Sequence, residues 1–153
     1  GTRLHYDFVV KEGLYINLYN EIIYYLPRDL KEFGVTYDAA AGELVTDVTE
    51  SEYAYGYDLT FELEPQYALP LSEGLELGFA LPATYNMWPE TEVDGTGQDN
   101  DGYSFTVAPS VNLFAQNLPW PIDFDLSYSI PVAGKNTFAN HTIALQIKNY
   151  LQF

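Results

Sequence analysis

The segment IDFDLSYSIPV, Ile122 to Val132, alternates apolar and polar residues along its whole length. Its even positions carry Ile, Phe, Leu, Tyr, Ile and Val, and its odd positions carry Asp, Asp, Ser, Ser and Pro. Successive side chains of a β-strand point to opposite faces of the sheet. The segment therefore has one apolar face and one acidic face, and the fold depends on where each face is directed.

The same alternation recurs through the chain and predicts an all-β protein. No stretch of useful length has the i, i+3, i+4 spacing of an amphipathic helix. Neighbouring segments lie close enough in sequence to be joined as antiparallel hairpins. We expect a single domain over residues 1–153, with strands near 2–10, 14–26, 53–69, 75–88, 103–117, 122–132 and 142–153.

Alternation is compatible with two opposite directions for the apolar face. In a soluble β-sandwich or barrel the apolar residues point inward and the polar residues meet water. In a membrane-spanning β-barrel the apolar residues face lipid and the polar residues line the interior. The first alternative would give a Tyr-rich protein that binds a ligand or carbohydrate, and a small structural or adhesive barrel is a further alternative.

Connection lengths and strand lengths favour the membrane-spanning barrel. Short turns are expected at 12–13, 72–74 and 118–121, whereas long external loops are expected at 27–51 and 89–102. Short turns on one side and long loops on the other are typical of such barrels. Several segments also reach the ~9–11 residues that cross a bilayer. Tyr and Trp gather at strand ends, where amphipathic rings favour the interface between water and lipid.

The ending HTIALQIKNYLQF resembles the C-terminal strand of Gram-negative outer-membrane β-barrels, which alternates apolar residues and closes on a terminal aromatic. This resemblance implies a location in the bacterial outer membrane and contact with the lipid bilayer. It also implies that Leu151 and Phe153 belong to a signal for the barrel assembly machinery. Asn149 departs from the pattern, which prefers an apolar residue there. The rest of the chain resembles the family in pattern only.

The number of expected strands, seven, leaves three architectures open. Bacterial single-chain barrels usually have an even number of strands. An eighth strand within 27–51 would complete a small up-and-down barrel. The chain could instead be the C-terminal part of a larger barrel, which we favour, or several subunits could share one barrel. The segment 34–50 could form a small hairpin around Ala40, Ala41 and Gly42, although we interpret it as an elaborated loop.

The predicted barrel divides the strand residues into two sets. The set expected to line the lumen is Asp7, Glu21, Asp58, Glu62, Glu64, Glu76, Asp123, Asp125 and Lys148. The set expected to face lipid is Leu59, Phe61, Leu63, Leu77, Phe79, Phe105, Phe124, Leu126, Ile143, Leu145 and Ile147. Unpaired charges are costly in a narrow dry interior, so the excess of carboxylates favours a hydrated lumen.

Composition narrows the expected partners. The chain has 22 Asp and Glu, six Lys and Arg, no Cys and a formal net charge of -16. Such a charge opposes nucleic-acid binding, which needs clustered Lys and Arg, and the lack of Cys excludes disulfides and thiolate metal sites. We expect a passive channel or transporter for small solutes. Carboxylates in its wet pore would favour cations.

Two further groups of residues were candidates for chemistry. The loop DGTGQDNDG places Asp94, Asp99 and Asp101 among glycines, as a Ca²⁺ loop does, although Asp and Gly are also ordinary turn residues. His5 and Asp7 could form an acid–base pair. No nucleophile, base and orienting group occur together in the sequence, so we expect no enzymatic activity and no cofactor other than Ca²⁺.

Overall fold

The computed structural model describes residues 1–150, and these residues form β-strands joined by turns and loops. The main sheet contains nine strands. They are β1 (Thr2–Lys11), β2 (Leu14–Tyr25), β5 (Gly56–Ser72), β6 (Leu75–Ala80), β7 (Ala83–Trp88), β10 (Gly102–Val107), β11 (Ser110–Ala115), β12 (Ile122–Lys135) and β13 (Thr142–Asn149). All pairings are antiparallel. The expected all-β, antiparallel architecture is confirmed.

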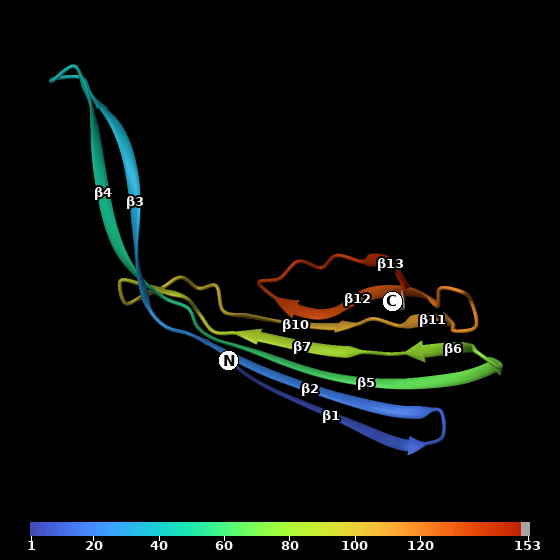
Figure 1. The fold of residues 1–153 in the computed structure, drawn as a ribbon. Coiled ribbons are helices and arrows are strands. Elements are labelled where there is room, and N and C mark those ends of the chain that lie inside the picture. Colours follow the sequence, from blue (N-terminus) through green and yellow to red (C-terminus); the bar gives the residue numbers. More distant parts are fainter. Residues whose placement is uncertain (151–153) are drawn as a thin grey trace.

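The nine strands occupy seven positions across the sheet, because two pairs of strands lie end to end. β6 and β7 both pair with β5, and β10 and β11 both pair with β12. The resulting order is β1, β2, β5, β6/β7, β10/β11, β12 and β13 (Figure 1). This order is a meander: strands that follow one another in sequence lie side by side, apart from residues 28–54 and 92–97, whose strands form a second sheet.

Prolines mark the places where the end-to-end strands are interrupted. Pro82 separates β6 from β7, and Pro109 separates β10 from β11. Proline has no backbone N–H to give to a ladder. The neighbouring amides keep the sheet continuous: Leu81 N donates to Pro65 O at 3.0 Å, Ala108 N to Pro82 O at 2.9 Å, and Tyr128 N to Pro109 O at 3.0 Å. Three adjacent strand positions therefore carry a proline along one line across the sheet.

Within residues 1–150 the sheet is open rather than closed. β1 pairs only with β2, and β13 pairs only with β12. Both are edge strands with apolar residues that are more than half exposed, such as Val10 and Ile143. Uncovered edge strands of this kind invite pairing with further strands. Six antiparallel steps separate the two edges, so β1 and β13 run in the same direction.

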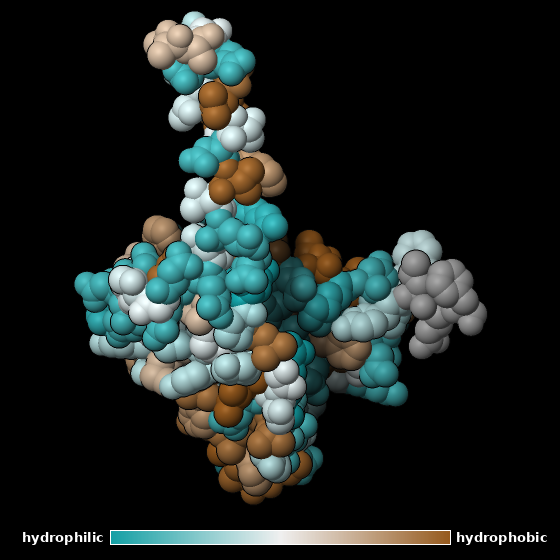
Figure 2. Space-filling model, turned by 90° about the vertical axis from the view of Figure 1, so that its left-hand side faces the viewer, coloured by the Kyte–Doolittle hydropathy of each residue, from teal (hydrophilic) through white to brown (hydrophobic). Residues whose placement is uncertain are grey.

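The polar stretch 27–51 differs from the predicted elaborated loop. It lies within a regular hairpin formed by β3 (Arg28–Asp38) and β4 (Glu43–Ala54), with its turn over 39–42. The hairpin stands away from the main sheet in both views (Figures 1 and 2). Phe33 pairs with Val48 and Tyr37 with Leu44 on one of its faces. The alternative of a hairpin around Ala40 to Gly42 was thus the better interpretation. The hairpin itself is longer than expected.

The second long connection also contains short strands. β8 (Glu92–Val93) pairs with β4, and β9 (Thr96–Gly97) pairs with β8. Asp94 ties this small hairpin to β4, because its N–H donates to Glu52 O at 2.9 Å and its Oδ1 accepts from Glu52 N at 2.8 Å. Both long connections therefore meet at one end of the main sheet, and the short turns lie at the other end.

The described residues contain no buried hydrophobic side chain. The chain exposes 11009 Å² of surface, whereas a compact monomer of its mass exposes about 7,800 Å² by the usual scaling of area with mass. The sheet is curved, and hydrophilic side chains lie in the recess between its two arms while hydrophobic ones gather toward its lower end (Figure 2). Burial of apolar surface inside this chain does not hold the sheet together, and the backbone ladders carry most of its order.

Candidate functional site

The strand register places all nine predicted lumen residues on one face of the main sheet, which we call the acidic face. Residues paired directly across two strands share a face. Asp7 pairs with Asn17, Asn17 with Glu64, and Asp123 with Lys148. Following the pairs from β1 to β13 gives Asp7, Glu21, Asp58, Glu62, Glu64, Glu76, Asp125, Asp123 and Lys148 on this face.

The eleven residues expected to face lipid lie together on the opposite face, which we call the apolar face. Phe61 pairs with Tyr85 and Tyr85 with Phe105, while Leu126 pairs with Leu145. Leu126 is 52% exposed and Phe124 is 40% exposed, whereas Asp123, the residue before Phe124 on β12, is only 9% exposed. The polar side of the strand is therefore the sheltered one, the reverse of a soluble β-protein. Contact with lipid itself stays a prediction.

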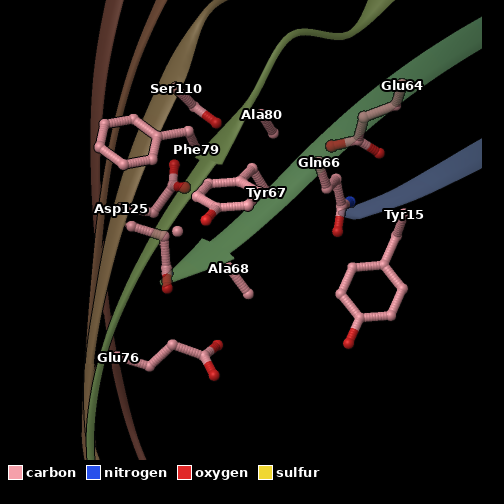
Figure 3. A pocket seen from close by; sticks show the side chains of 12 residues that line it. Tyr15, Glu64, Gln66, Tyr67, Ala68, Glu76, Phe79, Ala80, Ser110 and Asp125 are labelled. Atoms are coloured by element: carbon pink, nitrogen blue, oxygen red, sulfur yellow. The ribbon is translucent and has the colours of Figure 1, made fainter. Parts of the chain in front are cut away.

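A hollow of about 430 Å³ lies on the acidic face near the short-turn end of the sheet (Figure 3). Its lining comes from five strands, β2, β5, β6, β11 and β12. Glu64, Glu76 and Asp125 contribute carboxylates, and Gln66 and Asn112 contribute amides. On the intervening strand β6, Gly78 has no side chain and Ala80 has only a methyl group, which leaves room for the hollow. The hollow is therefore open and polar.

Hydrogen bonds between neighbouring strands hold many polar side chains of the acidic face in place. Thr84 Oγ1 donates to Glu62 Oε2 at 2.7 Å. Thr60 Oγ1 donates to Asn86 Oδ1 at 2.8 Å, and Asn86 Nδ2 donates to Ser104 Oγ at 3.4 Å. The sequence reasoning did not identify these partners, because the strand register decides which polar residues meet.

Only two ion pairs with Lys or Arg occur on the acidic face among residues 1–150. Arg3 pairs with Glu21, and Lys148 Nζ lies 3.8 Å from Asp123 Oδ2. Asp123 also accepts a hydrogen bond from Asn112 Nδ2. The other carboxylates of the predicted set have no Lys or Arg nitrogen within ion-pair distance in this part of the chain. The face is therefore strongly negative, so mobile cations must balance its charge while water screens it.

A second hollow, the aromatic basin, lies at the long-loop end of the acidic face. It has a volume of about 640 Å³ and is lined by Tyr24, Tyr25, Leu26, Arg28, Tyr55, Asp58, Trp88, Pro89 and Thr91. The rings of Tyr25 and Tyr55 meet edge to face, with centroids 6.4 Å apart and planes at 67°. Several of these aromatics were predicted only as part of an interfacial belt, and the fold brings residues from three distant segments together.

Polar contacts fix the walls of the basin. Tyr25 OH donates to Asp58 Oδ2 at 2.9 Å, and Trp88 Nε1 donates to the carbonyl oxygen of Asn100 at 3.0 Å. The Arg28 guanidinium carbon lies 5.3 Å from the centre of the Tyr55 ring, in cation–π geometry. The basin thus combines aromatic surfaces with one carboxylate and one guanidinium.

Gly102 gives Trp88 its position in the basin, and Gly102→Ala is expected to destabilise the fold. The two residues pair across β7 and β10, and Gly102 is buried. An added Cβ would lie 2.5 Å from both Lys135 O and Trp88 Cζ2. We expect a loss of about 1–3 kcal/mol, as for other overpacked sites. Chemical unfolding of Gly102→Ala and of the unsubstituted protein, both in the same solvent, measures this loss.

Gly34→Ala provides the control for this substitution. Gly34 also lies in a strand, but the nearest atoms to its added Cβ would be 3.9 Å away. It should cost little or stabilise slightly, since alanine restricts the unfolded chain more than glycine does. Equal losses in the two variants would contradict the role given to close packing at Gly102.

The predicted calcium residues are not gathered into one site. Within residues 1–150, no group of three or more His, Cys, Asp or Glu side chains could hold a metal ion. Asp94 accepts from the Glu52 amide, and Asp101 Oδ1 accepts from Lys135 Nζ at 2.7 Å. Asp94 and Asp99 have positive φ values of 50° and 52°, which suits their role as turn residues.

Calcium binding by this loop therefore stays a prediction with a direct test. If Asp94, Asp99 and Asp101 bind Ca²⁺ in the folded state, a chelator should lower the melting temperature by mass action. The triple Asn variant should then melt alike with and without the chelator. Identical melting curves for the unsubstituted protein in calcium and in chelator would contradict the prediction.

The histidines and the terminal signal complete the predicted sites. His5 Nε2 lies 2.9 Å from Asp7 Oδ1, and Tyr128 OH lies 2.9 Å from His141 Nδ1. Each histidine is thus in contact with a polar partner. The first pair lies within β1, and the second joins β12 to the residue before β13. Leu151 and Phe153, the predicted assembly signal, lie outside the described residues. No helix among residues 1–150 has the length and apolarity needed to span a bilayer.

Comparisons of the chain with protein-family models, curated protein sequences and solved structures give no match.

Proposed function

We propose that this chain forms part of the wall of a membrane-spanning β-barrel with an acidic, hydrated interior that passes small solutes, cations in preference to anions. The single observation that carries the proposal is the inverted exposure of the sheet. Apolar side chains such as Leu126 are exposed, while the carboxylate of Asp123 is sheltered. Lipid would cover the apolar face, and water would fill the space enclosed by the acidic face.

The lack of a buried core supports this proposal over a soluble sandwich. A soluble sandwich needs two apolar inner faces packed about 10 Å apart. The main sheet has one apolar face, and within residues 1–150 no second layer lies against it, because the other sheet is the projecting β3–β4 hairpin with β8 and β9. A soluble protein of this sequence would expose the apolar face to water, which favours association or aggregation.

Further strands are needed to close the proposed barrel. β1 and β13 run in the same direction, so joining them directly would require a parallel pair. An odd number of added strands restores antiparallel pairing at both edges. They could come from the same polypeptide or from other subunits. A larger barrel agrees with the excess of carboxylates, since wide barrels enclose water whereas eight-stranded ones are filled by side chains.

The first test of the proposed function is the partition of the protein between detergent and water. We expect the folded protein to need detergent or lipid, and its gel mobility to change on heating because the folded barrel resists unfolding in the sample buffer. A folded, monodisperse monomer in detergent-free buffer would contradict the membrane location. In planar bilayers, a folded and inserted protein without conductance would contradict solute passage while leaving the barrel architecture in place.

A further inference from the structure

The aromatic basin has the features of a binding site for an organic ligand. Tyr24, Tyr25, Tyr55 and Trp88 supply its apolar surface, and Asp58 supplies a carboxylate. Its volume of about 640 Å³ falls within the range of small-molecule sites, which are mostly apolar with a few placed polar groups. Nothing in the proposed passage of small ions requires such a site.

The structure itself indicates which chemical class the rings accept. Arg28 places a guanidinium over Tyr55, so one aromatic wall of the basin is already in contact with a cationic side chain of the protein itself. The negative face of an aromatic ring attracts guanidinium and quaternary ammonium groups. The Tyr25 ring stands edge to face against Tyr55, and its hydroxyl holds Asp58 in place. Rings and carboxylate together form a partial cage.

The charges around the basin favour a positive ligand. Behind Tyr55, the Tyr53 ring stacks on it with centroids 6.0 Å apart. The Tyr53 hydroxyl donates to Glu32 Oε1 at 3.3 Å, and the negative charge of Glu32 raises the pKa of Tyr53. Asp58 lines the basin, and the acidic face extends from its floor. Among the residues that line the basin, Asp58 and Arg28 carry one opposite charge each, so the negative excess comes from Glu32 and from the acidic face next to the basin.

We propose that the aromatic basin binds organic cations that carry apolar groups, of the quaternary-ammonium or alkylguanidinium type. The ligand would place its charge near Asp58 and its apolar surface on Tyr24, Tyr25 and Trp88. The inference rests on the proposed function in one respect: the basin lies at the mouth of the acidic face and would concentrate such solutes there. The Arg28 guanidinium, which lies over the Tyr55 ring, repels the positive ligand and competes with it for Tyr55.

Choline and its uncharged isostere, 3,3-dimethyl-1-butanol, test this site in the folded full-length chain. The chain has two tryptophans, and Trp120 lies in the short turn at the opposite end of the sheet. Trp120→Phe leaves Trp88 as the only indole reporter. Choline should change the Trp88 fluorescence in a saturable manner, whereas the isostere and glucose should not. Binding of the isostere or glucose in place of choline would overturn the proposal.

Two substitutions in this background separate a cation site from a site for neutral ligands. Asp58→Asn should weaken choline binding about fivefold, the upper range for a half-exposed ion pair. Glu76→Gln, on the acidic face near the short turns, is the matched control and should change it little. Arg28→Gln should strengthen choline binding because it removes the competing guanidinium. Weaker binding by Arg28→Gln, or equal effects of the two carboxylate variants, would overturn the proposal.

Conductance measurements distinguish the failure of this inference from the failure of the proposed function. Cation-selective conductance without choline binding refutes the basin site and leaves the channel standing. Saturable choline binding to a folded protein without conductance supports the basin site and refutes the channel.

Discussion

Leu126→Lys is expected to reduce the free energy of unfolding in a lipid bilayer by about 2–4 kcal/mol, the cost of a lysine on the lipid face near the bilayer midplane. Leu126 lies on the apolar face, paired with Val111 on one side and Leu145 on the other. It is 52% exposed, so no packing inside this chain explains a large loss. In a protein surrounded by water, surface substitutions usually stay within about 0.5 kcal/mol.

Ser127→Lys is the matched control, because it places the same charge one residue along the same strand. Ser127 pairs with Ser110 and Ala144 on the acidic face, and the added cation would lie two residues from Asp125. Unfolding by denaturant in vesicles should show a much smaller loss for this variant. Equal losses for the two lysines would contradict the assignment of the two faces.

Neutralising carboxylates of the acidic face should reduce the preference for cations in planar bilayers. We expect the triple variant Glu62→Gln, Glu64→Gln, Asp125→Asn to lower the ratio of cation to anion permeability roughly fivefold, equivalent to about 1 kcal/mol, the Coulomb energy of two unit charges 4 Å apart in water. Glu64 and Asp125 line the hollow of this face. The reversal potential under a salt gradient measures the ratio.

The control for this variant removes three charges from the part of the β3–β4 hairpin that projects from the main sheet. Asp38 pairs with Glu43, and Asp47 pairs with Gly34, away from the main sheet. Asp38→Asn, Glu43→Gln and Asp47→Asn change the net charge by the same amount but should leave selectivity nearly unchanged. A similar shift in both triple variants would indicate that total charge, rather than the acidic face, sets the preference.

The division of the main sheet into two faces could be predicted from sequence because a strand has a period of two residues. Ile122 to Val132 shows this period without interruption in the sequence, and the strand register keeps it as far as Pro131. A bulge at Val132 then shifts the register, because Thr106 pairs with Pro131 but Phe105 pairs with Ala133. The register then brings Asp123 opposite Lys148. Periodicity within one strand cannot predict that pairing, because it says nothing about the offset between strands.

The β3–β4 hairpin and the aromatic basin were harder to predict, for different reasons. The hairpin has its own alternation, with Phe33, Val35 and Tyr37 on one face, but frequent acids and Gly34 resemble a loop. Basin residues such as Tyr25, Tyr55 and Trp88 are about thirty residues apart in sequence. Only the pairing of β5 with both β2 and β7 brings them together.

The line of prolines at Pro65, Pro82 and Pro109 has a mechanical consequence for the wall. Each proline withholds one amide from the ladder at its strand position, so the sheet resists bending least along this crease. Amide exchange next to the crease should be faster than in the ladders on either side. Small movements about it would widen or narrow the space in front of the middle strands, because the crease crosses β5, β6/β7 and β10/β11 and leaves the ladders of the outer strands intact.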